Sequence, residues 1–165
     1  MNRPYSSKNN SQSSLSPIDY AYQLLARRDY SEQELSTKLL VKGFTEEAVF
    51  HTISRLKEQN YLNDTRLAVD QSERLQAQGF GPEGVKAKLA QKGFSSETIE
   101  HVLSANDAMD SRASARKLLA SRFSADALKQ PQTYARAFRL LLRRGYSQDV
   151  VESVLGNAPG EKPES

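Results

Sequence analysis

The stretch Gly79–Ile99, GFGPEGVKAKLAQKGFSSETI, contains the signals for two helices and the turns that bound them. Gly79 suits the position just after a helix end, where a positive φ costs glycine little. Pro82 after Gly81 suits the first position of the next helix, because proline has a fixed φ and no N–H. A lysine followed by Gly93 predicts the end of that helix. The stretch therefore predicts helices joined by tight glycine turns.

The basic residue, glycine and aromatic residue that end this helix occur three times, with glycines at Gly43, Gly93 and Gly145. A leucine lies four residues before each glycine, and a valine or isoleucine lies six residues after it. This agreement indicates an internal repeat of about 50 residues. Six residues are predicted to be structural hinges of the repeat: Gly43, Gly79, Gly81, Pro82, Gly93 and Gly145.

Apolar residues recur at helical spacing in every unit, and no segment alternates as a strand does. Ser31 and Glu34 predict a capping box, and Leu35, Leu39 and Leu40 predict the apolar face of the helix that follows. The predicted fold is all-α, with three tandem three-helix repeats in an elongated, curved array. The predicted divisions are a disordered polar tail (1–16), three repeats (17–60, 61–105 and 106–156) and a second disordered tail (157–165).

Composition restricts the chemistry that the chain can carry. The 165 residues include no Cys, which excludes disulfides and thiolate metal sites. No apolar run approaches the roughly 20 residues that span a bilayer, and the N-terminus lacks the apolar middle region of a secretory signal. These features predict a cytoplasmic protein.

Charge is distributed unevenly along the chain. Between Asp29 and Asp64, seven acidic residues against four basic ones give −3, whereas between Ser111 and Gly145, nine basic residues against one acidic residue give +8. On the predicted long helix 132–144, three arginines lie opposite a predicted core face of Tyr134, Phe138, Leu141 and Leu142. The candidate partner- or DNA-binding residues are Arg112, Arg116, Lys117, Arg136, Arg139, Leu140, Arg143 and Arg144.

Two interpretations of this basic face remain open: an ordinary solvated helix surface, or a contact with an acidic partner, either nucleic acid or protein. Ordinary surfaces mix the two signs, which favours a partner. Aromatic side chains for base stacking are not predicted on the basic side.

No catalytic, cofactor or metal site is predicted. His51 and His101 occupy the same position in successive repeats and are not expected to converge. The pairs Glu46/Glu47 and Asp107/Asp110 lie where helices begin, where carboxylates cap free N–H groups. The Gly79–Pro82 turn lacks the preceding strand and the Lys-Ser/Thr ending of a phosphate loop. The chain is therefore predicted not to be an enzyme.

The segment Tyr61–Ile99 resembles the RecX family of bacterial recombination regulators. The segments LLARRDYSEQELSTKLLVKGFTEEAV and FRLLLRRGYSQDVVESVL resemble the first and third repeats of that family. The resemblance covers roughly Ile18 to Leu155 and rests on the Tyr-Leu-Asn-Asp joint, the Gly-Phe-Gly-Pro turn and the three glycine helix ends. The longer joint at Ser124–Pro131 departs from the pattern.

The resemblance implies a binding partner, which the helical periodicity of the sequence does not indicate. RecX-like proteins bind the filament that the RecA recombinase forms on single-stranded DNA, and they restrain its ATP hydrolysis, strand exchange and co-protease activity. The chain is thus expected to be a monomeric regulator of DNA repair and the SOS response, with possible binding of single- or double-stranded DNA. The alternative is a nucleic-acid-binding helical repeat protein that acts without the recombinase, through its basic third repeat.

Overall fold

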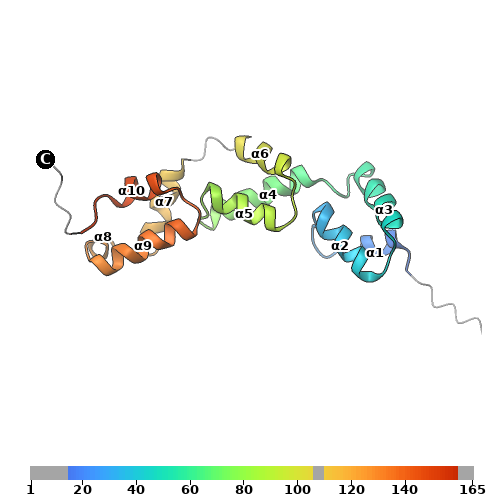
Figure 1. Cartoon of the computed structure of the whole chain (residues 1–165), viewed down its shortest axis with the longest axis horizontal. Helices are drawn as coiled ribbons and strands as arrows, with labels where there is room; N and C mark the ends of the chain where they lie inside the picture. Colours follow the sequence, from blue (N-terminus) through green and yellow to red (C-terminus); the bar gives the residue numbers. More distant parts are fainter. Residues whose placement is uncertain (1–14, 106–109, 160–165) are drawn as a thin grey trace, which may run out of the picture.

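The computed structural model describes residues 15–105 and 110–159, and within them it contains ten helices and no strand. Figure 1 shows that they form an elongated array with the first helices at one end and the last at the other. The helices are α1 (Pro17–Leu25), α2 (Glu32–Lys42), α3 (Glu46–Glu58), α4 (Asp64–Ala77), α5 (Pro82–Gln91), α6 (Ser96–Ala105), α7 (Ser111–Ala120), α8 (Ala125–Leu128), α9 (Pro131–Arg143) and α10 (Gln148–Leu155).

Three separate apolar clusters follow one another along the chain, so the all-α repeat architecture is confirmed. The first, in α1–α3, is centred on Leu35, Leu39 and Leu56. The second, in α4–α6, is centred on Val85, Leu89 and Val102. The third, in α7–α10, is centred on Ala115, Leu141 and Val151. Each repeat therefore has a small core of its own, and contacts between repeats must hold the array together. The exact divisions between the repeats stay a prediction.

Local sequence signals account for the helix ends. Ser31 and Glu34 form the expected capping box at the start of α2. Gly81 and Pro82 begin α5 as N-cap and first helical residue. The four glycines predicted to follow helices have positive φ, at Gly43 (102°), Gly79 (83°), Gly93 (81°) and Gly145 (83°). These are conformations that side chains disfavour, which explains glycine at each of the four turns.

The second helices of the three repeats lie head to tail. The C-terminal turn of α5 contacts the N-terminus of α2, through Ser31 Oγ, which donates to the Lys92 carbonyl. The C-terminal turn of α9 contacts the N-terminus of α5, through the Gly81 N–H, which donates to the Arg144 carbonyl. As a result α9, α5 and α2 follow one another along the long axis in Figure 1.

Several sequence expectations need correction. Leu40 and Leu142 are not core residues, with 43% and 41% of their surface exposed. Each lies five residues beyond a buried side chain, Leu35 or Ala137, and hence about 140° around its helix. The predicted joint at Ser124–Pro131 contains α8, which packs against α9. The predicted tails lie largely outside the described residues, although Ser16 caps α1.

Candidate functional site

The third repeat presents an arginine-rich surface on α9. Ala137 and Leu141 are fully buried against α7 and α10. Arg136, Arg139 and Arg143 lie on the other side of the same helix and are exposed. The 3.6-residue period explains this separation, because residues 136, 139 and 143 fall within about 60° of one another.

A hollow of about 460 Å³ forms between these arginines and the end of α7. Arg122 and Phe123, which directly follow α7, complete its wall. Leu140 is half-buried in the same hollow, so the leucine predicted among the arginines lies there. The hollow thus combines four guanidinium groups with one aromatic and one aliphatic side chain. We call this set, Arg122, Phe123, Arg136, Arg139, Leu140 and Arg143, the arginine hollow.

The positive charge of the arginine hollow is not neutralised within residues 15–105 and 110–159. The ion pairs seen there are Arg28–Glu34, Lys57–Glu32 and Lys129–Asp126. None of them involves an arginine of the hollow, and Arg139 Nε donates to the backbone carbonyl of Ala135, 3.1 Å away. Guanidinium groups without carboxylate partners at a concave surface attract anions.

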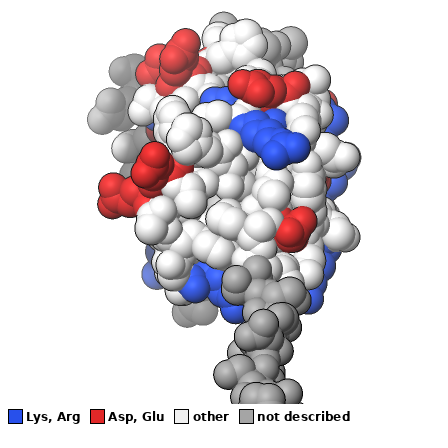
Figure 2. Space-filling view, turned by 90° about the vertical axis from the view of Figure 1, so that its right-hand side faces the viewer, with Lys and Arg blue, Asp and Glu red and all other residues white. Residues whose placement is uncertain are grey.

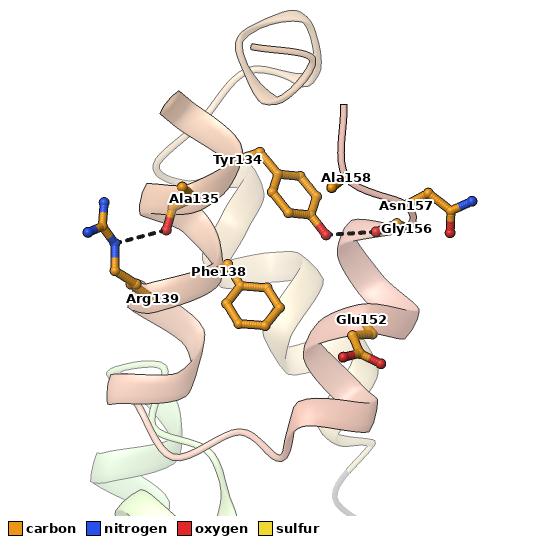
Figure 3. A pocket seen from close by; sticks show the side chains of 8 residues that line it. All are labelled: Tyr134, Ala135, Phe138, Arg139, Glu152, Gly156, Asn157 and Ala158. Atoms are coloured by element: carbon orange, nitrogen blue, oxygen red, sulfur yellow. Dashed lines mark hydrogen bonds between the residues drawn. The ribbon is translucent and has the colours of Figure 1, made fainter. Parts of the chain in front are cut away.

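A second hollow of about 660 Å³ lies on the other side of Arg139, between α9 and the end of α10 (Figure 3). The rings of Tyr134 and Phe138 stack with centroids 6.3 Å apart, and the Tyr134 hydroxyl donates to the Gly156 carbonyl. Tyr134 and Phe138 were predicted to be core residues. Phe138 packs against the third core, and both rings remain partly exposed.

The remaining predicted binding residues lie elsewhere. Arg112 and Arg116 are exposed on α7 and line neither hollow. Lys117 and Arg144 line a third hollow, between the second and third repeats. Arg144 Nη1 donates to the Gln78 carbonyl at 2.8 Å, and its guanidinium lies 4.5 Å from the centre of the Phe80 ring. The structure thus gives Arg144 contacts that join two repeats.

The junction between the second and third repeats is a contact between backbones. The Gly81 N–H donates to the Arg144 carbonyl at 2.9 Å, and the Glu83 N–H donates to the Gly145 carbonyl at 3.2 Å. A Cβ at Gly81 would lie 2.6 Å from the Gly145 oxygen, and one at Gly84 would collide with the Arg144 oxygen. Sequence reasoning missed Gly84, although the Gly-Phe-Gly-Pro-Glu-Gly run already indicated a close backbone approach.

The junction between the first and second repeats relies on side chains. Ser31 Oγ donates to the Lys92 carbonyl at 2.7 Å. The Glu32 N–H donates to Asp64 Oδ1 at 2.9 Å. Burial raises the pKa of the Asp64 carboxyl above its ordinary value, an effect that the Glu32 N–H opposes and the Glu32 carboxylate reinforces.

The described acidic and histidine residues that were considered as candidates for chemistry lie at helix starts or on exposed helix surfaces. Glu46 and Glu47 lie in the first turn of α3, and Asp110 caps α7 by accepting from two backbone N–H groups, while Asp107 lies outside the described residues. His51 and His101 are exposed on α3 and α6. In the described part of the chain, no three His, Asp or Glu residues are grouped so as to hold a metal, and no helix has the length and apolar content to cross a bilayer.

Comparison with known proteins shows which family this chain resembles in sequence. Residues 18–56 match the family model for the first three-helix domain of RecX. The chain is 31% identical to the Regulatory protein RecX of Xanthomonas axonopodis pv. citri (strain 306) over 137 residues, covering 83% of this chain and 84% of that protein. It is 33% identical to the Regulatory protein RecX of Vibrio campbellii over 141 residues, covering 86% and 90%.

Solved structures show the same fold. The crystal structure of RecX from Lactobacillus salivarius superposes with a TM-score of 0.69 at 18% identity, covering 84% of this chain and 92% of that one. A second crystal structure of a regulatory protein RecX gives a TM-score of 0.70 at 20% identity, covering 93% and 81%. The repeated helical cores, the glycine junctions and the identity to curated relatives over most of their length agree: this chain belongs to the RecX family of regulatory proteins.

Proposed function

We propose that this protein binds the filament of the RecA recombinase on single-stranded DNA and inhibits its ATPase, strand-exchange and co-protease activities. In this proposal the arginine hollow contacts either the DNA phosphates or acidic residues of the filament. The more acidic first repeat contacts basic surface elsewhere on the filament. The protein would thereby moderate recombinational repair and the SOS response.

The observation that carries the proposal is the unneutralised arginine hollow at one end of an elongated array. Four arginines converge on one concavity of about 460 Å³, and none of them pairs with a carboxylate within the described residues. Binding of an anionic group there would supply charge-assisted hydrogen bonds without first breaking an internal ion pair. An elongated array also offers contact to more than one subunit of a filament.

The test is RecA ATPase activity on preformed filaments, titrated with this protein. Wild type is expected to lower the ATPase rate, whereas Arg136→Glu/Arg139→Glu/Arg143→Glu is expected to inhibit at least about tenfold more weakly, since opposed charges replace three contacts. The matched control is Arg66→Glu/Arg74→Glu/Lys86→Glu, which reverses three exposed charges of the second repeat. Absence of any effect of wild type on the ATPase would contradict the proposal.

A second candidate function is binding of nucleic acid without the recombinase. Phe123 favours it, because this half-buried ring lines the arginine hollow and aromatic rings stack on bases. Binding to labelled single- and double-stranded DNA, measured against salt concentration, separates the two functions. A binder of phosphates alone loses affinity steeply with salt. Tight DNA binding combined with an unchanged RecA ATPase would favour this second function.

A further inference from the structure

The hollows of the third repeat are joined through shared arginines. Arg139 lines both the arginine hollow and the hollow of about 660 Å³ between α9 and the end of α10. Arg122 lines both the arginine hollow and the hollow of about 560 Å³ at the junction with the second repeat. We call these two neighbours the aromatic hollow, lined by residues that include Tyr134, Phe138, Arg139 and Glu152, and the junction hollow, lined by residues that include Gln78, Lys117, Arg122 and Arg144. The three hollows therefore form one path across the repeat.

Two of the three hollows along this path are basic. The junction hollow is lined by Lys117, Arg122 and Arg144, and none of the described residues in its wall is acidic. The same holds for the wall of the arginine hollow, which adds three further arginines. In the part of the chain that the structure describes, none of these basic side chains forms an ion pair. Cationic groups that follow one another along a path fit a ligand whose negative charge is repeated along its length, as the phosphates of nucleic acid are.

The opposite end of the array differs in the arrangement of its charges. Figure 2 views the molecule from the end formed by the first repeat and shows acidic and basic side chains interspersed among uncharged ones. Two ion pairs, Arg28–Glu34 and Lys57–Glu32, join residues of this repeat. Opposite charges that lie close together largely cancel at a distance, so a polyanion is attracted preferentially to the third repeat.

The aromatic hollow differs from the other two in its chemistry. The rings of Tyr134 and Phe138 stack there with centroids 6.3 Å apart, and both are partly exposed. Figure 3 shows both rings on the side of α9 that faces the end of α10, whereas the Arg139 side chain points to the other side of α9. Partly exposed rings in a hollow provide a surface on which a flat aromatic group packs, and a nucleobase is such a group.

The charged group in the wall opposite the rings suits a base better than a phosphate. Glu152 is exposed on α10 and lines the aromatic hollow, where its carboxylate repels a phosphate. Gln148 Nε2 donates to Glu152 Oε1 at 2.6 Å, which helps to hold the carboxylate in place. A carboxylate has further acceptor capacity for the exocyclic amino group of a base. The path therefore changes from a surface for phosphates to a surface for a base as it crosses α9 at Arg139.

We propose that single-stranded DNA binds along this path, with its phosphates in the junction and arginine hollows and a base in the aromatic hollow, against Tyr134 and Phe138. This inference rests on the proposed function for the role of the arginine hollow, and it assigns a DNA strand rather than acidic residues of the filament to that surface. A duplex fits less well, because a paired base must first leave its stack to reach a pocket. An acidic protein segment has no base to fill the aromatic hollow.

The first experiment compares two polymers that carry the same charge. The affinity of the full chain is measured, at one salt concentration, for an oligothymidylate of about 12 nucleotides and for a deoxyribose–phosphate oligomer of the same length without bases. We expect the oligothymidylate to bind at least about fivefold more tightly, which corresponds to the lower end of what one stacked base contributes. Equal affinities would overturn the inference, because phosphates alone would then account for binding.

The second experiment locates the base by substitution. Tyr134→Leu removes one ring of the stacked pair and should lose most of the preference for the oligothymidylate, while its affinity for the oligomer without bases stays near that of wild type. Tyr134→Phe keeps the ring and loses only the hydroxyl that donates to the Gly156 carbonyl, so it should bind both polymers as wild type does. The matched control is Phe50→Leu, which removes a ring that is 69% exposed on α3. A full preference in Tyr134→Leu, or a lost one in Phe50→Leu, would overturn the inference.

The third experiment needs no substitution in the protein. An oligothymidylate in which iodouracil replaces thymine is illuminated in complex with wild type, and the crosslinked residue is identified by mass spectrometry. Crosslinks to Tyr134 or Phe138 are expected. A crosslink to Phe123 alone would place the base in the arginine hollow and would overturn the inference. Crosslinks confined to the first two repeats, or none at all, would do the same.

The outcomes separate this inference from the proposed function. If wild type inhibits the RecA ATPase and the triple arginine variant does not, while polymers with and without bases bind equally, the base site is wrong and the proposed function stands. If the oligothymidylate binds through Tyr134 as expected while wild type leaves the ATPase unchanged, the base site stands and the proposed function fails.

Discussion

The two junctions of the array have the same topology and different chemistry. Between the second and third repeats, backbone N–H groups of Gly81 and Glu83 donate to backbone carbonyls, and Gly84 leaves room for the approach. Between the first and second repeats, the contact passes through the side chains of Ser31 and Asp64. Backbone contacts with no intervening side chain have few alternative geometries. We therefore expect the second junction to be rigid and the first to bend more easily.

The strongest test of this comparison measures the loss of folding stability in Gly145→Ala and in Gly43→Ala. Both glycines have positive φ, so alanine should cost about 1–2 kcal/mol at either position for conformation alone. Only Gly145 lies against another repeat, and a Cβ there would collide with Gly84. Gly145→Ala should lose about 1–3 kcal/mol more for overpacking.

Chemical denaturation monitored by far-UV circular dichroism measures both losses. Equal destabilisation of the two variants would show that the close contact at the second junction is not energetically important. A greater loss for Gly43→Ala would contradict the observation that nothing lies within 4 Å of the position a Cβ would take at Gly43.

The first junction is tested by Ser31→Ala against Ser147→Ala. Both serines cap helices, and loss of a cap costs about 1 kcal/mol. Ser31 is also fully buried and donates to the Lys92 carbonyl, so its removal leaves a further acceptor unpaired, at about 1 kcal/mol more. Ser31→Ala should therefore cost about 2 kcal/mol in total.

Solution scattering provides a second measure for the serine variants. The angle between the first and second repeats should become more variable in Ser31→Ala and stay unchanged in Ser147→Ala. If the two variants matched in both stability and scattering, the serine contact between repeats would have no role in the junction.

The smallest expected effect is a dependence on pH at the first junction. Burial raises the folded-state pKa of Asp64 above its ordinary value of 3.8. Its contribution to stability is therefore fully present below pH 3.8 and is lost as pH rises through the raised pKa. Asp64→Asn keeps an oxygen acceptor without the charge, so it should gain stability relative to wild type as pH increases through this window.

Denaturation curves collected at several pH values measure this difference for Asp64→Asn. The control is Asp70→Asn, which removes a carboxylate from an exposed position of the same helix. A stability difference between Asp64→Asn and wild type that is constant over the window, or that declines with rising pH, would contradict the assignment.

Local signals predicted most of the fold, because caps and turns depend on neighbouring residues. Ser31 with Glu34, and glycine at position 93, specify a helix start and a helix end without reference to the rest of the chain. The residues that sequence reasoning misplaced depend on contacts from other elements. Gly84 is explained only by the Arg144 carbonyl that approaches it. Leu40 and Leu142 remain exposed because no neighbouring element of the described chain covers them.

The candidate site was predictable in part. The spacing of Arg136, Arg139 and Arg143 on one side of α9 follows from the helical period alone. Phe123 and Arg122 could not be added to them from sequence, because the path of the chain after α7 places them there. The same limit applies to Arg144. Its position next to the other arginines in sequence suggested a shared surface, whereas the junction orients it towards Gln78.

The head-to-tail order of α9, α5 and α2 gives the molecule a net electric dipole along its long axis. Each helix has a macrodipole with its positive end at the N-terminus, and here all three dipoles point the same way along the array. Their positive end coincides with the arginine-rich third repeat, and their negative end with the more acidic first repeat. In the field of a polyanion the protein would therefore experience a torque that aligns it before contact, so that association becomes faster and more uniform in orientation as ionic strength falls.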